Sequence, residues 1–486
     1  MKYDKLIFEL SVPGRIGYTL AETGIDKVDL TKIYPDQLLR QEAPRLPEVG
    51  ELDVVRHYTN VSKLNFGIET GFYPLGSCTM KYNPKINDEA ASQPGFRNIH
   101  PLQDETTLQP LLKLYDDTAK MLSHIAGMDA TSLNSFAGAH GELTGLMIMK
   151  AYHERRGDSK RTKMIIPDSA HGTNPASAAM LGYECVTIKS TPQGLVDIEA
   201  LKAVLSEEVA GIMLTNPNTL GLFETDILEI SRLVHGIGGL LYYDGANLNA
   251  LLGVARPGDM GFDIMHMNLH KTFSTPHGGG GPGSGPVSVK GHLAHLLPHP
   301  RIVLKNDRYI IERDGDSIGQ IGGFFGNFLV VVRAYAYLKS FGRELNAIGP
   351  LAVLNANYVK EKLRHAYHLP IDAHYMHEFV FNGLIDQSTG IKTLDIAKRL
   401  LDFGVHAPTI YFPLLFDQSI MVEPTEVESK ATLDHFIDLM LRIAKEAIEE
   451  PDCVKLAPHF TPVGRLDEVK AARNPILNYR DYVKSI

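Results

Sequence analysis

Short apolar runs alternate with helical stretches over the middle of the chain. Each run ends in a polar or glycine-containing turn; the runs are 164–167, 185–188, 211–215, 238–244 and, less regular, 262–268. Helical patterns at 197–209 and 224–235 lie between them. Buried short strands separated by helices are typical of a parallel α/β sheet. Ligands of such sheets bind at the carboxyl ends of the strands, where we therefore expect the functional residues.

The flanking regions carry different patterns. Residues 1–115 are polar and interrupted by scattered prolines, which break helices repeatedly, so we expect an extended arm. A large domain then spans 116–344, and its last part, 324–341, predicts a buried helix. A smaller α/β domain is expected over 345–450 and a surface tail over 451–486. The smaller domain has helical patterns at 349–366, 391–403 and 428–450 and apolar runs at 378–381 and 419–423.

Composition and charge exclude several classes of protein. Hydrophobic residues make up 44% and charged residues 22%, as in ordinary soluble globular proteins. The net charge is −9, so the chain lacks the basic surface that nucleic acids require. No apolar stretch approaches the ~20 residues of a membrane span, and the first residues do not resemble a signal peptide. We expect neither nucleic acid nor membrane as a partner.

The three cysteines carry a separate message. Cys78, Cys185 and Cys453 are far apart in the sequence. Their spacing rules out a disulfide framework and any CxxC zinc site, and we expect no metal. A reducing, cytoplasmic location is the default for such a chain.

Lys271 is the strongest local feature. It stands between His270 and Thr272 in the segment NLHKTFSTPHGGGGPGSG, and the glycines at 278–281 let the backbone approach a ligand or another chain. No Gly-Lys-Ser/Thr follows a GxxxxG pattern, so this is not a P-loop. On this segment alone, a solvated lysine beside a flexible loop is an equal alternative.

Asp244 ends the apolar run 238–244. A carboxylate at the carboxyl end of a buried strand is costly unless it meets a cation, although it can also cap the next turn. The 27 residues between Asp244 and Lys271 leave room for a short helix and one more strand. Both groups would then point into the same crevice.

Three further segments place polar groups near strand ends. SFAGAHGELTG (135–145) opens a helix, and the free N–H groups of such a helix start can hold a phosphate. His171 follows the run 164–167, and its ring can stack on a flat ligand. The segment TNPNTLGLFE (215–224) offers amides and hydroxyls. Taken singly, a common helix start, a structural histidine and an Asn-Pro turn explain them equally well.

Together these features fit a pyridoxal phosphate site. The chain presents a phosphate-binding helix start, a ring, a polar turn, Asp244 and then Lys271 in that order. The lysine amine forms a Schiff base with the aldehyde, and the aspartate keeps the ring nitrogen protonated so that the ring accepts electrons. Burial and a nearby cationic ring favour the neutral amine that this reaction needs.

The chain resembles the pyridoxal-phosphate-dependent P proteins of the glycine cleavage system, glycine dehydrogenase (decarboxylating). Its length and motifs are similar to subunit 2 of the two-subunit bacterial form. The matching stretches cover most of the chain: GFYPLGSCTMKYNP (71–84), FRNIHP (96–101), AGAHGELTGL, AHGTNPASA, TNPNTLGLFE, YYDGANLNA, NLHKTFSTPHGGGGPGSGP, GGFFGN (322–327) and PTEVESK (424–430).

The resemblance implies a fold, a reaction and partners. The fold is the α/β fold type I of pyridoxal phosphate enzymes, with a large domain around a mainly parallel sheet, a smaller C-terminal α/β domain and an extended N-terminal arm. Glycine displaces Lys271 and loses CO2, and the aminomethyl group passes to the lipoyl arm of the H protein. The family also implies an α2β2 assembly with subunit 1, and 319–327 is a candidate loop for a neighbouring subunit's site.

The resemblance also assigns roles to residues. Lys271, Asp244 and His171 are the expected catalytic residues, with His171 stacked over the ring. Further expected cofactor-binding residues are Gly138, Ala139, His270, Thr272, Thr215, Asn216 and Asn247. Residues expected where glycine and the lipoyl arm meet are Ser77, Cys78, Thr79 and, as a weaker candidate for proton transfer, His100. Cys78 is either redox-sensitive or an inert buried thiol.

Two alternative functions stay open. One is another pyridoxal phosphate enzyme of the same fold, such as an amino-acid decarboxylase or a cysteine desulfurase; the PLGSCTMK and HKTF…PHGGGGPG segments argue against it. The other is a non-catalytic scaffold subunit, against which the presence of Lys271, Asp244 and His171 argues.

Overall fold

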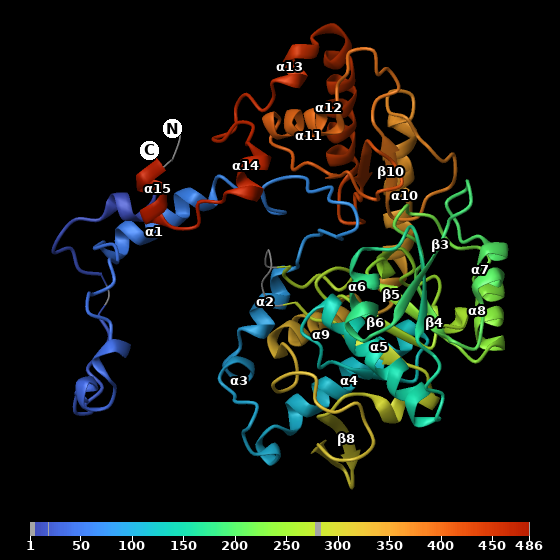
Figure 1. Ribbon diagram of the computed structural model, residues 1–486, viewed down its shortest axis with the longest axis horizontal. Helices are drawn as coiled ribbons and strands as arrows, with labels where there is room; N and C mark the ends of the chain where they lie inside the picture. The colour runs from blue at the N-terminus through green and yellow to red at the C-terminus, as the bar shows by residue number, and fades with distance from the viewer. Residues whose placement is uncertain (1–4, 18, 278–282, 486) are drawn as a thin grey trace. The chain divides into compact units, whose positions relative to one another are not determined.

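The computed structural model describes residues 5–17, 19–277 and 283–485. The glycines at 278–281, expected to approach a ligand, lie outside the described residues. By its internal contacts the chain divides into two compact units, residues 68–456 and residues 1–67 together with 457–486 (Figure 1).

Seven strands form the central sheet of the unit 68–456, in the order β1-β7-β6-β5-β4-β2-β3. The strands from β6 to β3 run parallel, and β7 is antiparallel to both of its neighbours. This mainly parallel sheet confirms the predicted α/β class. The strands are β1 Ala130–Ser132, β2 Lys163–Pro167, β3 Glu184–Ile188, β4 Val209–Thr215, β5 Leu240–Gly245, β6 Ile264–Met267 and β7 Val287–Val289.

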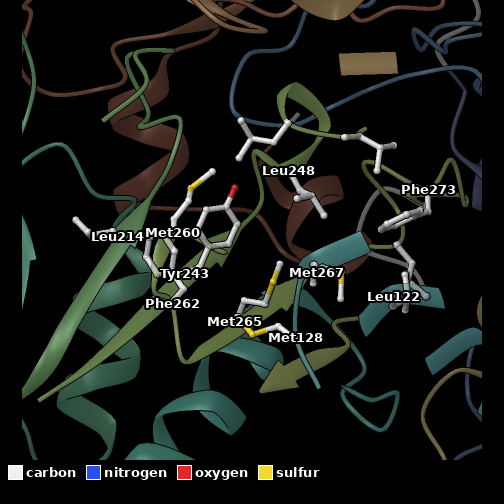
Figure 2. Packing of buried hydrophobic residues seen from close by; sticks show 14 of the residues in the cluster. Leu122, Met128, Leu214, Tyr243, Leu248, Met260, Phe262, Met265, Met267 and Phe273 are labelled. Carbon is white, nitrogen blue, oxygen red and sulfur yellow. The ribbon is translucent and has the colours of Figure 1, made fainter. Parts of the chain in front are cut away.

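Helices cover both faces of this sheet. Alternate residues of a strand point to opposite faces, so Tyr242 packs in one apolar core with residues of α5, while Leu241 and Tyr243 join the core that contains α4, α8 and α9. Figure 2 shows Tyr243 in this second core, among Phe262 and Met265. The helices are α4 Gln109–Ala126, α5 Gly138–Arg155, α6 Thr173–Met180, α7 Ile198–Val204, α8 Ile227–Gly236 and α9 Phe328–Phe341; the short 3-10 helices include η5 Leu248–Ala250, η6 Pro257–Met260 and η7 Gly291–Leu296.

A smaller antiparallel sheet follows, as predicted for the C-terminal part of the chain. Its strands pair in the order β10-β12-β11, and Phe379 of β10 lies opposite Val422 of β12. A third apolar core joins this sheet to its helices. The elements are α10 Ile348–Leu363, β10 Phe379–Asn382, α11 Thr393–Asp402, β11 Thr409–Ile410, β12 Ser419–Val422, α12 Lys430–Glu449 and α13 Pro451–Lys455.

The segment before α4 also belongs to this unit. The loop 74–84, which we name the 74–84 loop, meets the smaller sheet: Leu75 bridges to Val422, and the Thr409 hydroxyl donates to the Gly76 carbonyl at 2.7 Å. Helix α4 begins at Gln109 and so crosses the boundary expected near 115. The remaining elements are α2 Lys85–Ala91, α3 Pro94–Arg97, η4 Glu105–Thr107 and the hairpin β8 Arg301–Lys305 with β9 Arg308–Glu312.

The unit formed by 1–67 and 457–486 is sparsely packed. Phe8 stacks on Tyr479 with ring centroids 4.6 Å apart, while many of its apolar side chains are exposed. Its helix α1, which buries only His57, was not anticipated in the polar arm. The elements are η1 Ile7–Leu10, η2 Leu30–Lys32, η3 Asp36–Leu38, α1 Glu51–Ser62, α14 Glu468–Arg473 and α15 Tyr479–Ser485. The expected domain boundaries at 115, 344 and 450 stay predictions.

Across the described ranges, no helix is both long and apolar enough to cross a bilayer.

Candidate active site

A cavity of about 290 Å³ lies where several strands of the large sheet end. Thr215 is the last residue of β4, and Asp244 lies at the end of β5. Lys271 follows β6, and Gly138 begins α5. The cavity brings together most of the predicted residues, which are Ser77, Cys78, Gly138, Ala139, His171, Thr215, Asp244, Asn247, His270 and Lys271.

Lys271 sits in a turn just after β6. Its backbone N–H donates to the carbonyl of Asn268 at 3.0 Å, which starts the turn directly after the strand. Its side-chain Nζ donates to the carbonyl of Ser77 at 2.9 Å. The lysine therefore spans from the large sheet to the 74–84 loop, with its amine beside the cavity.

Asp244 is almost fully buried and held in its charged form. Its Oδ2 accepts a hydrogen bond from Asn174 at 3.0 Å, and its Oδ1 accepts one from the N–H of Ala246 at 3.0 Å. The ring of His266 lies 3.5 Å from Oδ1. Burial would raise the pKa of Asp244, but His266, these hydrogen bonds and Lys271 outweigh it and lower the pKa. The site thus offers a buried anion for a cationic ligand atom.

Glu142 of α5 is a second buried carboxyl near Asp244. It accepts hydrogen bonds from the Thr173 hydroxyl at 2.8 Å and from Asn174 at 3.1 Å, so Asn174 joins the two acids. Burial, and then the charge of Asp244, raise the pKa of Glu142 to about 7. The two carboxyls therefore divide the roles: Asp244 carries the charge and Glu142 holds a proton more readily.

His171 lines the cavity from the segment after β2. Its Nδ1 lies 2.9 Å from the Thr173 hydroxyl, and its ring meets the edge of Phe412 at 5.6 Å. Burial lowers the pKa of His171, and the opposing charges of Asp244 and Lys271 follow. A mostly neutral, partly buried ring at a cavity wall is suited to stacking on a flat ligand.

The start of α5 supplies a site for an anion. The first N–H groups of a helix lack intrahelical partners, and the helix dipole adds positive potential there. A Cβ at Gly138 would lie 2.7 Å from Asn268 Oδ1, so only glycine allows this approach. The buried atoms Thr215 Oγ1 and Asn268 Oδ1, both on the cavity wall, have no hydrogen-bond partner among the described residues. Buried polar atoms normally have partners, so this cavity fits a polar ligand that carries an anionic group.

The 74–84 loop closes the opposite side of the cavity. Ser77 has a φ of 63°, which is uncommon for a residue other than glycine. Its N–H donates to Glu378 Oε2 at 2.6 Å. Cys78 Sγ lies 3.4 Å from His277 Nε2, and burial raises the pKa of its thiol despite the charge of Lys271. The thiol therefore stays protonated, which is typical of an unreactive cysteine.

Four predicted residues lie outside the cavity. Asn216 is fully buried and accepts a hydrogen bond from the Glu224 N–H at 2.9 Å. Thr79 and Thr272 are buried without lining the cavity. His100 lines a different, apolar cavity of about 260 Å³, beside Phe324. Their proposed binding roles stay predictions.

Sequence reasoning missed several groups around the cavity. Glu142 and His266 stand inside quoted segments, but nothing in the pattern separates them from structural residues. Glu378 and Glu423 end the apolar runs 378–381 and 419–423, so each carries a signal: a carboxyl at the edge of a buried strand. Their proximity depends on strand pairing, which the sequence does not reveal.

The mainly parallel sheet, the smaller C-terminal domain and a lysine and an aspartate at neighbouring strand ends define the fold type I class of pyridoxal phosphate enzymes. The chain is similar to the solved glycine decarboxylase (P-protein) of the glycine cleavage system, with a TM-score of 0.73 and 18% identity over 85% of this chain and 94% of that one. It is also similar to the glutamate decarboxylase of Lactobacillus brevis, with a TM-score of 0.65 and 11% identity over 85% and 96%. These likenesses show the fold alone.

Sequence comparison is more specific. Residues 349–457 match the family described as glycine dehydrogenase, C-terminal domain. The chain is 58% identical, over 98% of its length and 99% of the relative, to the probable glycine dehydrogenase (decarboxylating) subunit 2 of Caldanaerobacter subterraneus. To the protein of the same name from Bacillus licheniformis it is 59% identical over 98% of each chain. The chain belongs to the glycine dehydrogenase (decarboxylating) subunit 2 family, which confirms the resemblance found in the sequence.

Proposed function

We propose that this chain decarboxylates glycine with pyridoxal phosphate bound at Lys271, releases CO2, and passes the aminomethyl group to the lipoyl arm of an H protein. The observation that carries the proposal is one cavity in which the Lys271 amine, the buried Asp244 carboxylate and the start of α5 meet. Family membership selects glycine as the substrate.

When bound, pyridoxal phosphate supplies an electron sink that accepts the electron pair left by the departing carboxylate. Lys271 would hold the cofactor covalently, and the charged Asp244 would keep its ring nitrogen protonated. Gly138 and Ala139 at the start of α5 would bind the phosphate, with Thr215 Oγ1 and Asn268 Oδ1 as further polar contacts. Oδ1 accepts hydrogen bonds, so Asn268 would face a protonated ligand atom.

The other cavity residues orient and enclose. His171 would stack on the cofactor ring from the side of β2. Asn174 holds Asp244 in place through its 3.0 Å hydrogen bond, and Glu142 fixes the same asparagine from the other side. Ser77 and Cys78 cover the cavity and limit the access of water, which strengthens the electrostatic interactions inside.

The first test is an absorption spectrum of the purified chain with pyridoxal phosphate and then glycine. We expect a visible band that Lys271→Ala cannot form, followed by a glycine-dependent spectral change. Lys290→Ala is the matched control, because Lys290 is also partly buried and donates to a backbone carbonyl, that of Gly127 at 2.8 Å. Exchange of labelled CO2 into glycine then separates this function from that of another fold type I enzyme. A wild-type chain that binds no cofactor, even with subunit 1 present, would favour the scaffold alternative.

The partners form a second part of the proposal. The family name, subunit 2, supports assembly with a subunit 1, which we propose to be an α2β2 heterotetramer. The unit 1–67 with 457–486 exposes large apolar side chains, including Ile16, Leu20 and Leu477, as expected of a segment that another chain covers. Light scattering of the chain alone and after co-expression with subunit 1 tests this, and a monomer in both samples would contradict it. The three free cysteines support a reducing, cytoplasmic location.

A further inference from the structure

Two glutamates lie side by side at the end of the smaller sheet that faces the 74–84 loop. Glu378 immediately precedes β10, and Glu423 immediately follows β12. Because Phe379 lies opposite Val422 in an antiparallel pair, the next residues outward, Glu378 and Glu423, are also opposite one another. Like charges at such positions repel, and here both side chains are buried, with exposures of 0% and 1%.

The surroundings leave part of this cluster without partners. Both oxygens of Glu423 and both ring nitrogens of the adjacent His377 are buried and lack hydrogen-bond partners among the described residues. Ligand atoms of His377, Glu378 and Glu423 lie within 4.8 Å of one another. Two buried carboxylates so placed cannot both carry charge without a cation or a proton between them.

The pair is tied to Lys271 through one residue of the 74–84 loop. The N–H of Ser77 donates to Glu378 Oε2 at 2.6 Å, and the carbonyl of Ser77 accepts from Lys271 Nζ at 2.9 Å. Asn247, which lines the cavity, lies 3.4 Å from Glu378 Oε1. The left-handed conformation of Ser77 thus presents its two backbone groups to the acid and to the amine.

We propose that Glu378 and Glu423 form a proton-sharing acid pair and that Glu378 exchanges a proton with Lys271. This deepens the proposed function, on which it rests, since Lys271 must lose a proton before it can bind an aldehyde. Glu378 is a positioning residue that acts through the protonation state of Lys271. Glu423 keeps its proton and prevents a second negative charge from facing the first.

The exchange balances without any further reactant. One N–H bond of the Lys271 ammonium breaks, and one O–H bond forms at Glu378. The ammonium becomes an amine and the carboxylate becomes an acid, so the total charge is unchanged and nothing is oxidised. Losing two opposite charges in a buried site also removes the cost of desolvating both.

The electrostatic setting supports this assignment. Burial raises the pKa of Glu378 to about 7, while the Ser77 hydrogen bond and the charge of Lys271 act in the opposite direction. Burial, and then the charge of Glu378, raise the pKa of Glu423 well above its usual range. Glu378 is therefore the member that titrates near neutral pH. The titratable and charged groups that face the pair are Lys271, Cys78, His377 and Glu426, the last bonded to Lys81.

The first test is infrared spectroscopy of the full, cofactor-free chain as a function of pH. We expect a protonated carboxylic-acid carbonyl band at neutral pH that loses intensity near pH 7 as Glu378 ionises. Glu378→Gln and Glu423→Gln should each remove part of the band. Glu428→Gln is the matched control, because burial raises the pKa of Glu428 too, but it lies away from Ser77 and Lys271. Isotopic labelling of glutamate in the wild type assigns the band even if a variant fails to fold.

The second test is the rate of pyridoxal phosphate uptake against pH. The Glu378 carboxylate stabilises the Lys271 ammonium, so Glu378→Gln should move the profile to lower pH by roughly one unit. Glu423→Gln replaces a protonated acid with a neutral amide, so it should move the profile much less. A merely structural role would change the rate at every pH without moving the profile.

Three outcomes would overturn the proposal. The first is the absence of a glutamic-acid band at neutral pH in the labelled wild type. The second is a pH profile that is the same in Glu378→Gln and the wild type. The third is a stoichiometric metal ion, found by elemental analysis of the wild type and lost in His377→Ala, since a cation would then neutralise the pair. An acid band without any glycine reaction would instead overturn the proposed function and leave the acid pair standing.

Discussion

Two buried acidic clusters meet the 74–84 loop, and they are neutralised in different ways. Near the end of the loop, Lys81 forms a 2.6 Å ion pair with Glu426 and donates to Asn249 at 2.9 Å. At the middle of the loop, Glu378 and Glu423 face each other with Ser77 above them. Three residues separate Glu423 from Glu426 in the chain, yet one carboxyl has a cation and the other has a neighbouring acid.

The difference shows how a buried charge is tolerated. Burial would lower the pKa of Lys81, but Glu426 and Tyr337 outweigh it and raise the pKa, so the pair stays ionised. The Glu378–Glu423 pair has no cation of that kind in hydrogen-bond contact among the described residues, so a proton takes its place. The first cluster holds the loop between the two sheets, and the second has a protonation state that responds to Lys271.

Breaking the ion pair should have the largest effect. Lys81→Met keeps most of the side-chain volume but leaves the buried Glu426 without its cation, which should lower the free energy of unfolding by about 3–5 kcal/mol. Urea unfolding measures the loss. Adding Glu426→Gln should recover most of it, since both charges are then gone. Lys85→Met is the control, because its ion pair with Glu69 is exposed, and it should change little. Equal midpoints for Lys81→Met and the wild type would contradict the assignment.

The acid pair should show itself in the pH dependence of stability. The pKa of Glu378 rises from an ordinary 4.5 to about 7 on folding, so the folded chain binds more protons between these values. Its contribution is fully present below about pH 4.5 and is lost as pH rises through 7, by about 3 kcal/mol in total. Glu378→Gln should therefore lose less stability than the wild type between these pH values.

Urea unfolding at several pH values checks this prediction. Glu142 also has a raised pKa, but it contributes the same slope to both proteins, so the difference between them reports Glu378. Glu428→Gln serves again as the control. Parallel slopes for the wild type and Glu378→Gln would mean that Glu378 is ionised in the folded chain.

The position of the loop itself can be disturbed without touching a charge. A Cβ at Gly76 would lie 2.2 Å from Met421 Cγ and 2.8 Å from the Met421 carbonyl. Gly76→Ala should therefore push the loop from β12, at a cost of about 1–3 kcal/mol in unfolding free energy. Gly95→Ala, where a Cβ meets nothing within 4 Å, is the control and should not destabilise. If both variants unfold alike, the loop is not held closely against β12.

Much of this arrangement was predictable from the sequence, for physical reasons. Every predicted strand of the large sheet appears within a few residues, because buried parallel strands leave strong apolar runs. The predicted helix 224–235 appears as α8 at Ile227–Gly236. Lys271, Asp244 and His171 meet at one cavity because the parallel topology brings strand ends together.

The rest depends on contacts that no local pattern encodes. Helix α1 was missed because its side chains are mostly exposed and prolines precede it. Asn216 has the composition of a binding residue, but its side chain caps the Glu224 N–H within the core. Glu378 and Glu423 come together only through the register of β10 and β12, although each ends a run that was predicted to be apolar.

The smallest effect expected is the influence of Lys271 on the acid pair. The charge of Lys271 lowers the pKa of Glu378, so Lys271→Ala should raise that pKa by roughly one unit, equivalent to about 1.4 kcal/mol. The infrared midpoint of the cofactor-free chain measures the shift. Lys290→Ala should leave the midpoint unchanged, because Lys290 is bonded to Gly127 and is not among the charges acting on Glu378. A midpoint that stays in place in Lys271→Ala would separate the acid pair from the lysine and reduce it to a structural feature like the ion pair beside it.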